Sequence, residues 1–110
     1  PERLCLDPGI GFGKTRQGDL DVAVHLHELM RGFPEMALLV GASRKDVIAA
    51  CCADRPAIDR RLPGTVAFHT AAILGGAHML RVHDVSVAVQ AARIADALRR
   101  SRGGERVLAE

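Results

Sequence analysis

Short apolar runs alternate with helical segments along this chain, and this alternation restricts its fold more than any other feature of the sequence. The apolar runs have the length of buried strands and are bounded by turn residues such as glycine and proline. The segments between them carry apolar residues at helical spacing or begin at capping and proline signals. The predicted strands are 4–6, 37–40 and 77–82. The predicted helices are 20–30, 47–52, 63–74 and a last one from 84 to about 100.

Two of the helices carry signals that predict their ends and faces. Ser43 and Asp46 have the spacing of a capping box ahead of helix 47–52. Asp84 or Ser86 is expected to cap the last helix, which ends in arginines where the helix dipole favours cations. The buried face of that helix is predicted to hold Val89, Ala92 and Leu98.

The order of strands and helices predicts an α/β fold. Strands separated by helices pair in parallel through right-handed crossovers. Three parallel strands then need covering helices, either in an open sheet or in part of a closed barrel. In both arrangements binding residues lie at the carboxyl ends of the strands. The unusual polar residues of this sequence directly follow the predicted strands, so we expect them to share one site.

Composition and charge exclude several classes of function. The chain has 110 residues, with 15 Lys and Arg against 13 Asp and Glu, and so small a surplus is not a nucleic-acid footprint. It has three Phe and no Trp or Tyr, so base-stacking platforms are not expected. No apolar stretch approaches the roughly 18 to 20 residues of a membrane span. Three cysteines, two of them adjacent, fit neither a disulfide framework nor zinc spacing. We expect a cytoplasmic protein without nucleic-acid or membrane partners.

The first strand end carries a candidate ligand for a heterocycle. Asp7 follows the strand and precedes Pro8 and a glycine-rich loop. Residues 13–15 resemble the end of a P-loop, but Pro8 stands where the first glycine of that motif is required, so a P-loop is not predicted. Strand alternation places Asp7 on the face opposite the leucines. Its carboxylate either accepts paired N–H bonds from an amidine-like ring or caps the turn.

The second strand end carries Ser43, Arg44 and Lys45. The capping box alone explains Ser43. The two adjacent cations are different, because a helix N-terminus already favours anions and gains no stability from positive side chains. We therefore interpret Arg44 and Lys45 as part of an anion site.

The third strand end places Arg81 and His83 on the same face, two residues apart. A buried arginine there needs an anionic partner. That partner is either a bound ligand or an internal carboxylate, Asp84 or Asp7. Cations from the two strand ends are expected to converge on a phosphate or diphosphate; they are Arg44, Lys45, Arg81 and His83.

Other histidines and the cysteines are weaker candidates. His25 and His27 lie two apart on a helix, face different directions and do not form a metal pair. His69 and His78 are interpreted as surface or helix-packing residues. The adjacent cysteines have no histidine partner nearby in the sequence and are interpreted as structural thiols.

Three segments, taken together, resemble dihydropteroate synthase. They are 6–14 (Leu-Asp-Pro-Gly-Ile-Gly-Phe-Gly-Lys), 40–45 (Val-Gly-Ala-Ser-Arg-Lys) and 76–85 (Gly-Ala-His-Met-Leu-Arg-Val-His-Asp-Val). They occur in the order of the last three strand ends of that family. Residues 61–65 (Arg-Leu-Pro-Gly-Thr) resemble the start of its intervening helix. The resemblance covers residues 3–100.

The resemblance implies a fold and an activity. The family is a (β/α)8 barrel that condenses 6-hydroxymethyl-7,8-dihydropterin diphosphate with p-aminobenzoate, giving 7,8-dihydropteroate and diphosphate, with Mg²⁺ on the diphosphate. The residues carried over by position are Asp7 and Lys45 for the pterin, Phe12, Ser43 and Arg44 for p-aminobenzoate, and Arg81 and His83 for the diphosphate.

Such a barrel needs about 250 residues, so we expect this chain to supply only its last three β/α units. These units are expected over 1–102, with 103–110 as a frayed tail. The resemblance places the Mg²⁺ ligand and further pterin contacts outside this segment, and it implies a homodimer for a full-length chain. The 110-residue chain alone is expected to be inactive.

Two other functions remain open from the sequence. The chain is alternatively a non-catalytic pterin- or phosphate-binding module, or a degenerate paralogue that assembles with another chain. The reading frame upstream of Pro1 would separate these from the enzyme. A pterin-binding methyltransferase domain shares the barrel, but the Ser-Arg-Lys and Arg-Val-His-Asp-Val segments disfavour it.

Overall fold

The computed structural model describes residues 4–109 and contains the predicted alternation of strands and helices. The elements in chain order are β1 (Cys5–Leu6), α1 (Arg16–Val24), α2 (Leu26–Arg31), β2 (Ala37–Val40), α3 (Asp46–Ala50), the 3₁₀ helix η1 (Ile58–Arg60), α4 (Leu62–Leu74), β3 (Met79–Leu80) and α5 (Val85–Arg102). No helix among residues 4–109 is long and apolar enough to cross a membrane.

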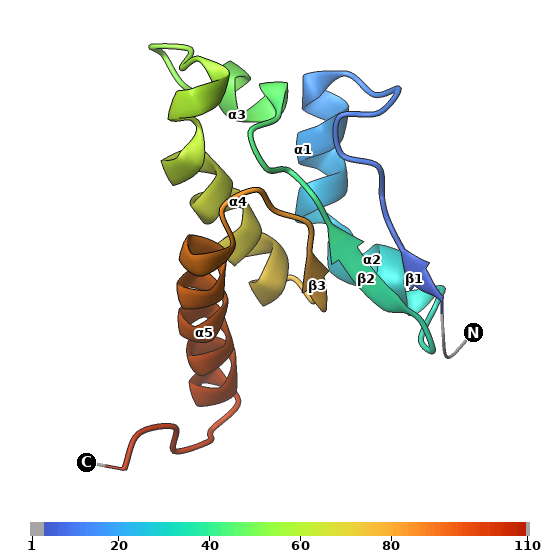
Figure 1. Cartoon of the computed structure of the whole chain (residues 1–110). Coiled ribbons are helices and arrows are strands. Elements are labelled where there is room, and N and C mark those ends of the chain that lie inside the picture. Colours follow the sequence, from blue (N-terminus) through green and yellow to red (C-terminus); the bar gives the residue numbers. More distant parts are fainter. Residues whose placement is uncertain (1–3, 110) are drawn as a thin grey trace.

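The described strands form one parallel sheet in the order β1-β2-β3 (Figure 1). Leu6 of β1 is in register with Leu38, and Val40 is in register with Leu80 of β3. Sequential parallel strands joined through helices are the repeating unit of α/β folds. The prediction of three parallel strands with covering helices is therefore confirmed.

The sheet has one covered face and one uncovered face. Leu38 and Val40 of the central strand are fully buried, and they belong to the core that the helices share with the sheet. Ala37 and Leu39 alternate with them and are only half-buried, while Met79 of β3 is 46% exposed. Period-two alternation therefore divides the strands into a helix side and a side that no element of residues 4–109 covers.

The predicted helix 20–30 is two helices, α1 and α2. Thr15 starts α1 earlier than predicted, because its Oγ1 accepts the Gly18 N–H at 3.0 Å and caps the helix. His25 separates the two helices, and its backbone N–H donates to the Val22 carbonyl at 3.1 Å instead of continuing the α-helical pattern. The apolar spacing identified the helical region but not this break.

The predicted capping box before helix 47–52 is wrong. Lys45, not Ser43, is the N-cap residue of α3, and it makes no side-chain capping bond. The Ser43 hydroxyl contacts His83 instead. Arg44 has a φ of 59°, a left-handed conformation that cannot belong to the helix. A long-range contact thus replaces the local one that the spacing indicated.

The third strand is shorter than the predicted 77–82. Hydrogen bonds to β2 do continue on both sides of β3, from the His78 N–H to Leu38 O at 2.8 Å and from the Arg81 N–H to Val40 O at 3.0 Å. At the carboxyl end the strand pairing stops at Leu80, because its partner Val40 is the last residue of β2.

Helix α4 confirms the predicted segment 63–74 to within one residue, with Pro63 in its first turn and Gly75 at its C-cap. Gly64 lets α4 approach α3 closely. A Cβ at this position would lie 2.3 Å from Cγ2 of Ile48, which is closer than side-chain carbons pack. Any larger residue at position 64 must displace the Ile48 side chain or move α4 away from α3.

The predicted buried face of the last helix is partly wrong. Val89 is 41% exposed and Leu98 is 53% exposed, whereas Ala95 is fully buried and Ala92 is half-buried. Helix α5 lies along α4 (Figure 1), and alanines let the two helices pack closely. The larger apolar residues flank this narrow contact and do not enter it.

Candidate functional site

The three strand ends bring the predicted site residues to one edge of the sheet, as parallel pairing requires. Loop 7–15 follows β1, residues 41–45 follow β2, and residues 81–84 follow β3. The side chains of these loops interact across the ends of the strands.

Asp7 and Arg81 form an ion pair between the outer strands. Asp7 Oδ2 lies 3.2 Å from Arg81 Nη1, and Asp7 Oδ1 accepts the Gly9 N–H at 2.8 Å. The Arg81 guanidinium crosses Gly41, where a Cβ would lie 3.0 Å from Nη2. Both internal interactions considered for these residues, the turn contact and the ion pair, are therefore present. The two side chains remain 34% and 52% exposed and accessible to a ligand.

Lys45 lies between the first two loops. Its ammonium donates to the Ile10 carbonyl and lies 4.6 Å from the centre of the Phe12 ring, a cation–π distance. Burial lowers the pKa of Lys45, and the nearby Arg81 guanidinium lowers it further, while the Asp7 carboxylate opposes these effects. The Phe12 ring beside the Lys45 ammonium is open to solvent, since this residue is 65% exposed.

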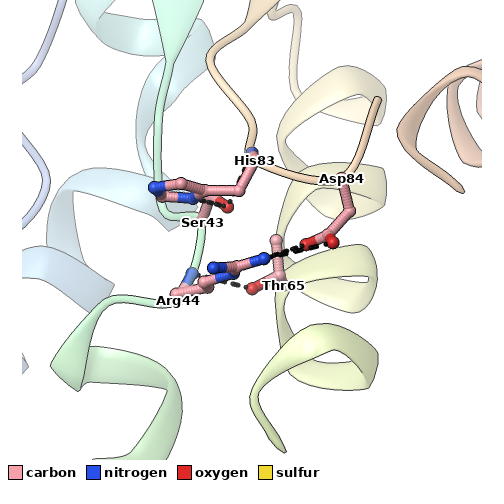
Figure 2. Close-up of polar contacts among 5 residues, drawn as sticks. All are labelled: Ser43, Arg44, Thr65, His83 and Asp84. Carbon is pink, nitrogen blue, oxygen red and sulfur yellow. Dashed lines mark hydrogen bonds and ion pairs between the residues drawn. The ribbon is translucent and has the colours of Figure 1, made fainter. Parts of the chain in front are cut away.

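Ser43 and His83 connect the second loop to the third (Figure 2). Ser43 Oγ lies 2.7 Å from His83 Nδ1 and accepts the His83 backbone N–H at 3.3 Å. Ser43 is 6% exposed, so its hydroxyl is committed to this contact inside the structure, whereas His83 is exposed.

Arg44 forms an ion pair with a carboxylate of the third loop. Its Nη2 pairs with Asp84 at 3.2 Å (Figure 2). Thr65 Oγ1 accepts its backbone N–H at 3.0 Å, and Arg61 Nη1 donates to its carbonyl at 2.9 Å. Helix α4 and the residue before it thus hold both backbone groups of a left-handed residue. The structure brings Lys45 near Arg81, but it holds Arg44 in an ion pair of its own.

Two histidines that the sequence did not place at the site fix the central strand. His69 Nε2 accepts the Ala42 N–H at 2.9 Å, and His78 Nδ1 accepts the Leu38 N–H at 2.9 Å. His69 is 2% exposed. Burial lowers its pKa from 6.5 to about 4, with a further contribution from the positive charge of Lys45. Neither contact has a local sequence signal, because each joins residues 27 or 40 positions apart.

A buried carboxylate supports the first loop. Asp19 of α1 is 2% exposed, and its Oδ1 accepts the Gly11 N–H at 3.1 Å. Within residues 4–109 no group of three or more His, Cys, Asp and Glu side chains is arranged to hold a metal ion.

Comparison with known proteins identifies the family and supports the fold. Residues 1–83 match the sequence pattern of the pterin binding enzyme family. The chain belongs to that family. The pattern ends at His83 and therefore includes all three strand ends.

Pterin binding enzymes of known function share high identity with the chain. It is 48% identical over 99 residues to a dihydropteroate synthase of Synechocystis sp., a match that covers 89% of the chain and 33% of that relative. It is 40% identical over 96 residues to the dihydropteroate synthase of Escherichia coli K12, and this match covers 87% of the chain and 33% of that relative. The resemblance stated from the three motifs is confirmed. The chain spans about a third of the length of these relatives.

Solved structures of pterin binding enzymes superimpose closely on the chain. A Yersinia pestis dihydropteroate synthase in a sulfonamide drug complex matches with a TM-score of 0.83 at 38% identity, covering 91% of this chain and 35% of that one. The Thermus thermophilus dihydropteroate synthase matches with a TM-score of 0.77 at 36% identity, and the match covers 86% of this chain and 36% of that one. The three parallel strands and their helices are thus consistent with part of the family's (β/α)8 barrel.

Proposed function

We propose that this chain provides the carboxyl-terminal strand ends of a dihydropteroate synthase. The reaction condenses 6-hydroxymethyl-7,8-dihydropterin diphosphate with p-aminobenzoate and releases 7,8-dihydropteroate and diphosphate. The observation that carries the proposal is the side-by-side placement of one exposed carboxylate and several cations at the carboxyl edge of a parallel sheet. A pterin offers N–H donors to the carboxylate, and its diphosphate matches the cations.

Asp7 is proposed to bind the pterin ring. An ionised carboxylate has about four acceptor positions, and the contacts with Gly9 and Arg81 use two of them. Two positions remain for paired N–H groups of the heterocycle. Lys45 is proposed to approach the same ring, because its ammonium donates to a loop carbonyl and its remaining N–H groups are free to donate to a ring acceptor.

Arg81 and His83 are proposed to hold the diphosphate. The guanidinium has about five N–H donors, and only Nη1 contacts Asp7. Strand alternation predicts that the remaining donors face the same side as His83. Positive charge fixed at this edge stabilises the diphosphate as it leaves the pterin methylene group, and the leaving group is then replaced by the amine of p-aminobenzoate.

Phe12, Ser43 and Arg44 are proposed to border p-aminobenzoate. The exposed Phe12 ring offers an apolar face to the benzene ring. The charged residues that line a cleft between the first loop and α3 are Lys14, Arg16, Lys45, Asp19 and Asp46. Arg16 pairs with Asp46 at 3.3 Å, so Lys14 and Lys45 are the cations proposed to meet the carboxylate of p-aminobenzoate. Ser43 and Arg44 lie behind this edge and shape it through their contacts with the third loop.

Mg²⁺, dimerisation and a cytoplasmic location complete the proposal. We assign the Mg²⁺ ligand to residues outside this chain, as the resemblance to dihydropteroate synthase implies, and no step above depends on it. Exposed Ile94 and Leu98 on α5 provide an apolar flank for a homodimer. The three cysteines are free thiols, which favours the reducing cytoplasm.

The test is a chimera of the Escherichia coli dihydropteroate synthase in which residues 1–110 replace the matching third. We expect the chimera to form dihydropteroate from the two substrates. A chimera with Arg81→Ala and Asp7→Asn provides the inactive control. A folded chimera without turnover would contradict the proposal.

The 110-residue chain by itself is expected to show no turnover, because it spans about a third of the length of its relatives and the resemblance places further pterin contacts outside it. Release of diphosphate from the pterin substrate by the purified chain, measured with p-aminobenzoate present, would contradict this expectation.

A further inference from the structure

The contact between Ser43 and His83 joins a buried hydroxyl to one ring nitrogen of His83. Both hydrogen bonds that the structure gives the Ser43 hydroxyl among the described residues go to His83. Oγ accepts the backbone N–H at 3.3 Å with a lone pair. Its own proton is therefore available to His83 Nδ1, which lies 2.7 Å away.

A neutral imidazole has one protonated nitrogen, and the partner of one nitrogen determines the state of the other. If Nδ1 accepts the Ser43 proton, the ring proton is on Nε2. This nitrogen lies on the side of the ring away from Asp84 (Figure 2). We infer that Ser43 is a positioning residue that keeps His83 as the Nε2–H tautomer, with an N–H donor presented at the site edge.

The surrounding contacts keep the Ser43 hydroxyl in place. Arg44, the next residue, is fixed in its left-handed conformation by Thr65 and tied to Asp84, the residue after His83. Two adjacent residues after β2 thus pair with two adjacent residues after β3. This double connection ties the two loops together through contacts within the chain.

The consequence concerns the anion at this edge. An Nε2–H group donates to a diphosphate oxygen next to Arg81, whereas an Nε2 lone pair would repel it. This step rests on the proposed function for the identity of the anion. The tautomer itself does not, because it follows from contacts within the chain.

The tautomer is tested on the 110-residue chain labelled with ¹⁵N-histidine, by long-range proton–nitrogen correlation at pH 8. The His83 signals are assigned by their loss in His83→Gln. We expect a single Nε2–H tautomer in the native chain and a mixture with Nδ1–H in Ser43→Ala. Ser43→Thr keeps a hydroxyl and should restore the native spectrum. Ser86→Ala removes an exposed hydroxyl of α5 and should change nothing.

Binding of inorganic diphosphate to the same variants tests the consequence. We expect Ser43→Ala to weaken binding about threefold to tenfold, the range for one orienting hydrogen bond, and Ser43→Thr to restore it. Nδ1–H as the main native tautomer, or an unchanged spectrum in Ser43→Ala, overturns the inference. If the spectra change as expected but the native chain does not bind diphosphate, the tautomer assignment is supported and the proposed anion site fails.

Discussion

Acid should destabilise this fold through His69. The imidazole accepts the Ala42 N–H inside the structure, and its pKa falls from 6.5 to about 4. A group with a lowered folded-state pKa contributes stability above its unfolded pKa and loses it as the pH falls toward the folded value. The unfolded chain takes up the proton first, so the loss begins near pH 6.5 and continues to about pH 4.

The expected size follows from the two pKa values. The pKa difference corresponds to a loss of about 3 kcal/mol in the free energy of unfolding once His69 is protonated in both states. About 2 kcal/mol of this loss falls between about pH 7.5 and pH 5. His69→Gln removes the titrating group but keeps an acceptor for Ala42. Urea unfolding of the 110-residue chain should show that the native chain loses about 2 kcal/mol more than His69→Gln over this pH interval.

An exposed histidine provides the matched control. His27 lies on α2 and is exposed, so His27→Gln should lose stability on acidification as the native chain does. Equal pH dependence in the native chain and His69→Gln would refute the reasoning, because the buried imidazole would then not link protonation to folding.

Three further substitutions test the site and its support. In the chimera, Arg81→Ala should weaken binding of the pterin diphosphate at least about tenfold, as expected for a lost charge-assisted hydrogen bond. Binding of p-aminobenzoate should be nearly unchanged. Equal losses of affinity for the two ligands, measured by calorimetry, would count against the diphosphate role. Thr65→Val leaves the Arg44 N–H without its acceptor and should lower the free energy of unfolding of the chain by about 1–3 kcal/mol, whereas Thr70→Val, which removes only a bond within α4, should cost less. Gly64→Ala should destabilise the chain by about 1–3 kcal/mol through its clash with Ile48. Ile48→Ala should relieve part of this cost in the double variant. Additive effects of the two substitutions on the free energy of unfolding would argue against the close approach.

Local signals in the sequence predicted the fold class well. The apolar run at 37–40 coincides with β2, and proline and glycine delimit α4 at both ends. These signals act within a few residues of one another. The parallel order then followed from the helices between the strands, since crossover connections restrict the pairing.

Contacts between distant residues explain the errors. The spacing of Ser43 and Asp46 satisfied a capping rule, yet the hydroxyl bonds to His83, which lies 40 positions away. The sequence indicated only a surface or helix-packing role for His69, because its acceptor role depends on the chain segment that follows β2. The sequence also grouped Arg44 with the other cations, and only the ion pair with Asp84 separates it from them.

Binding of 6-hydroxymethyl-7,8-dihydropterin diphosphate to the chimera tests the central claim most directly. Calorimetry should give a stoichiometric complex, and Asp7→Asn should abolish or strongly weaken it because an amide cannot accept both ring N–H groups. Asp59→Asn changes an exposed carboxylate of η1 and should leave the affinity unchanged. Equal affinities for the Asp7→Asn and Asp59→Asn chimeras would contradict the assignment of this strand edge to the pterin.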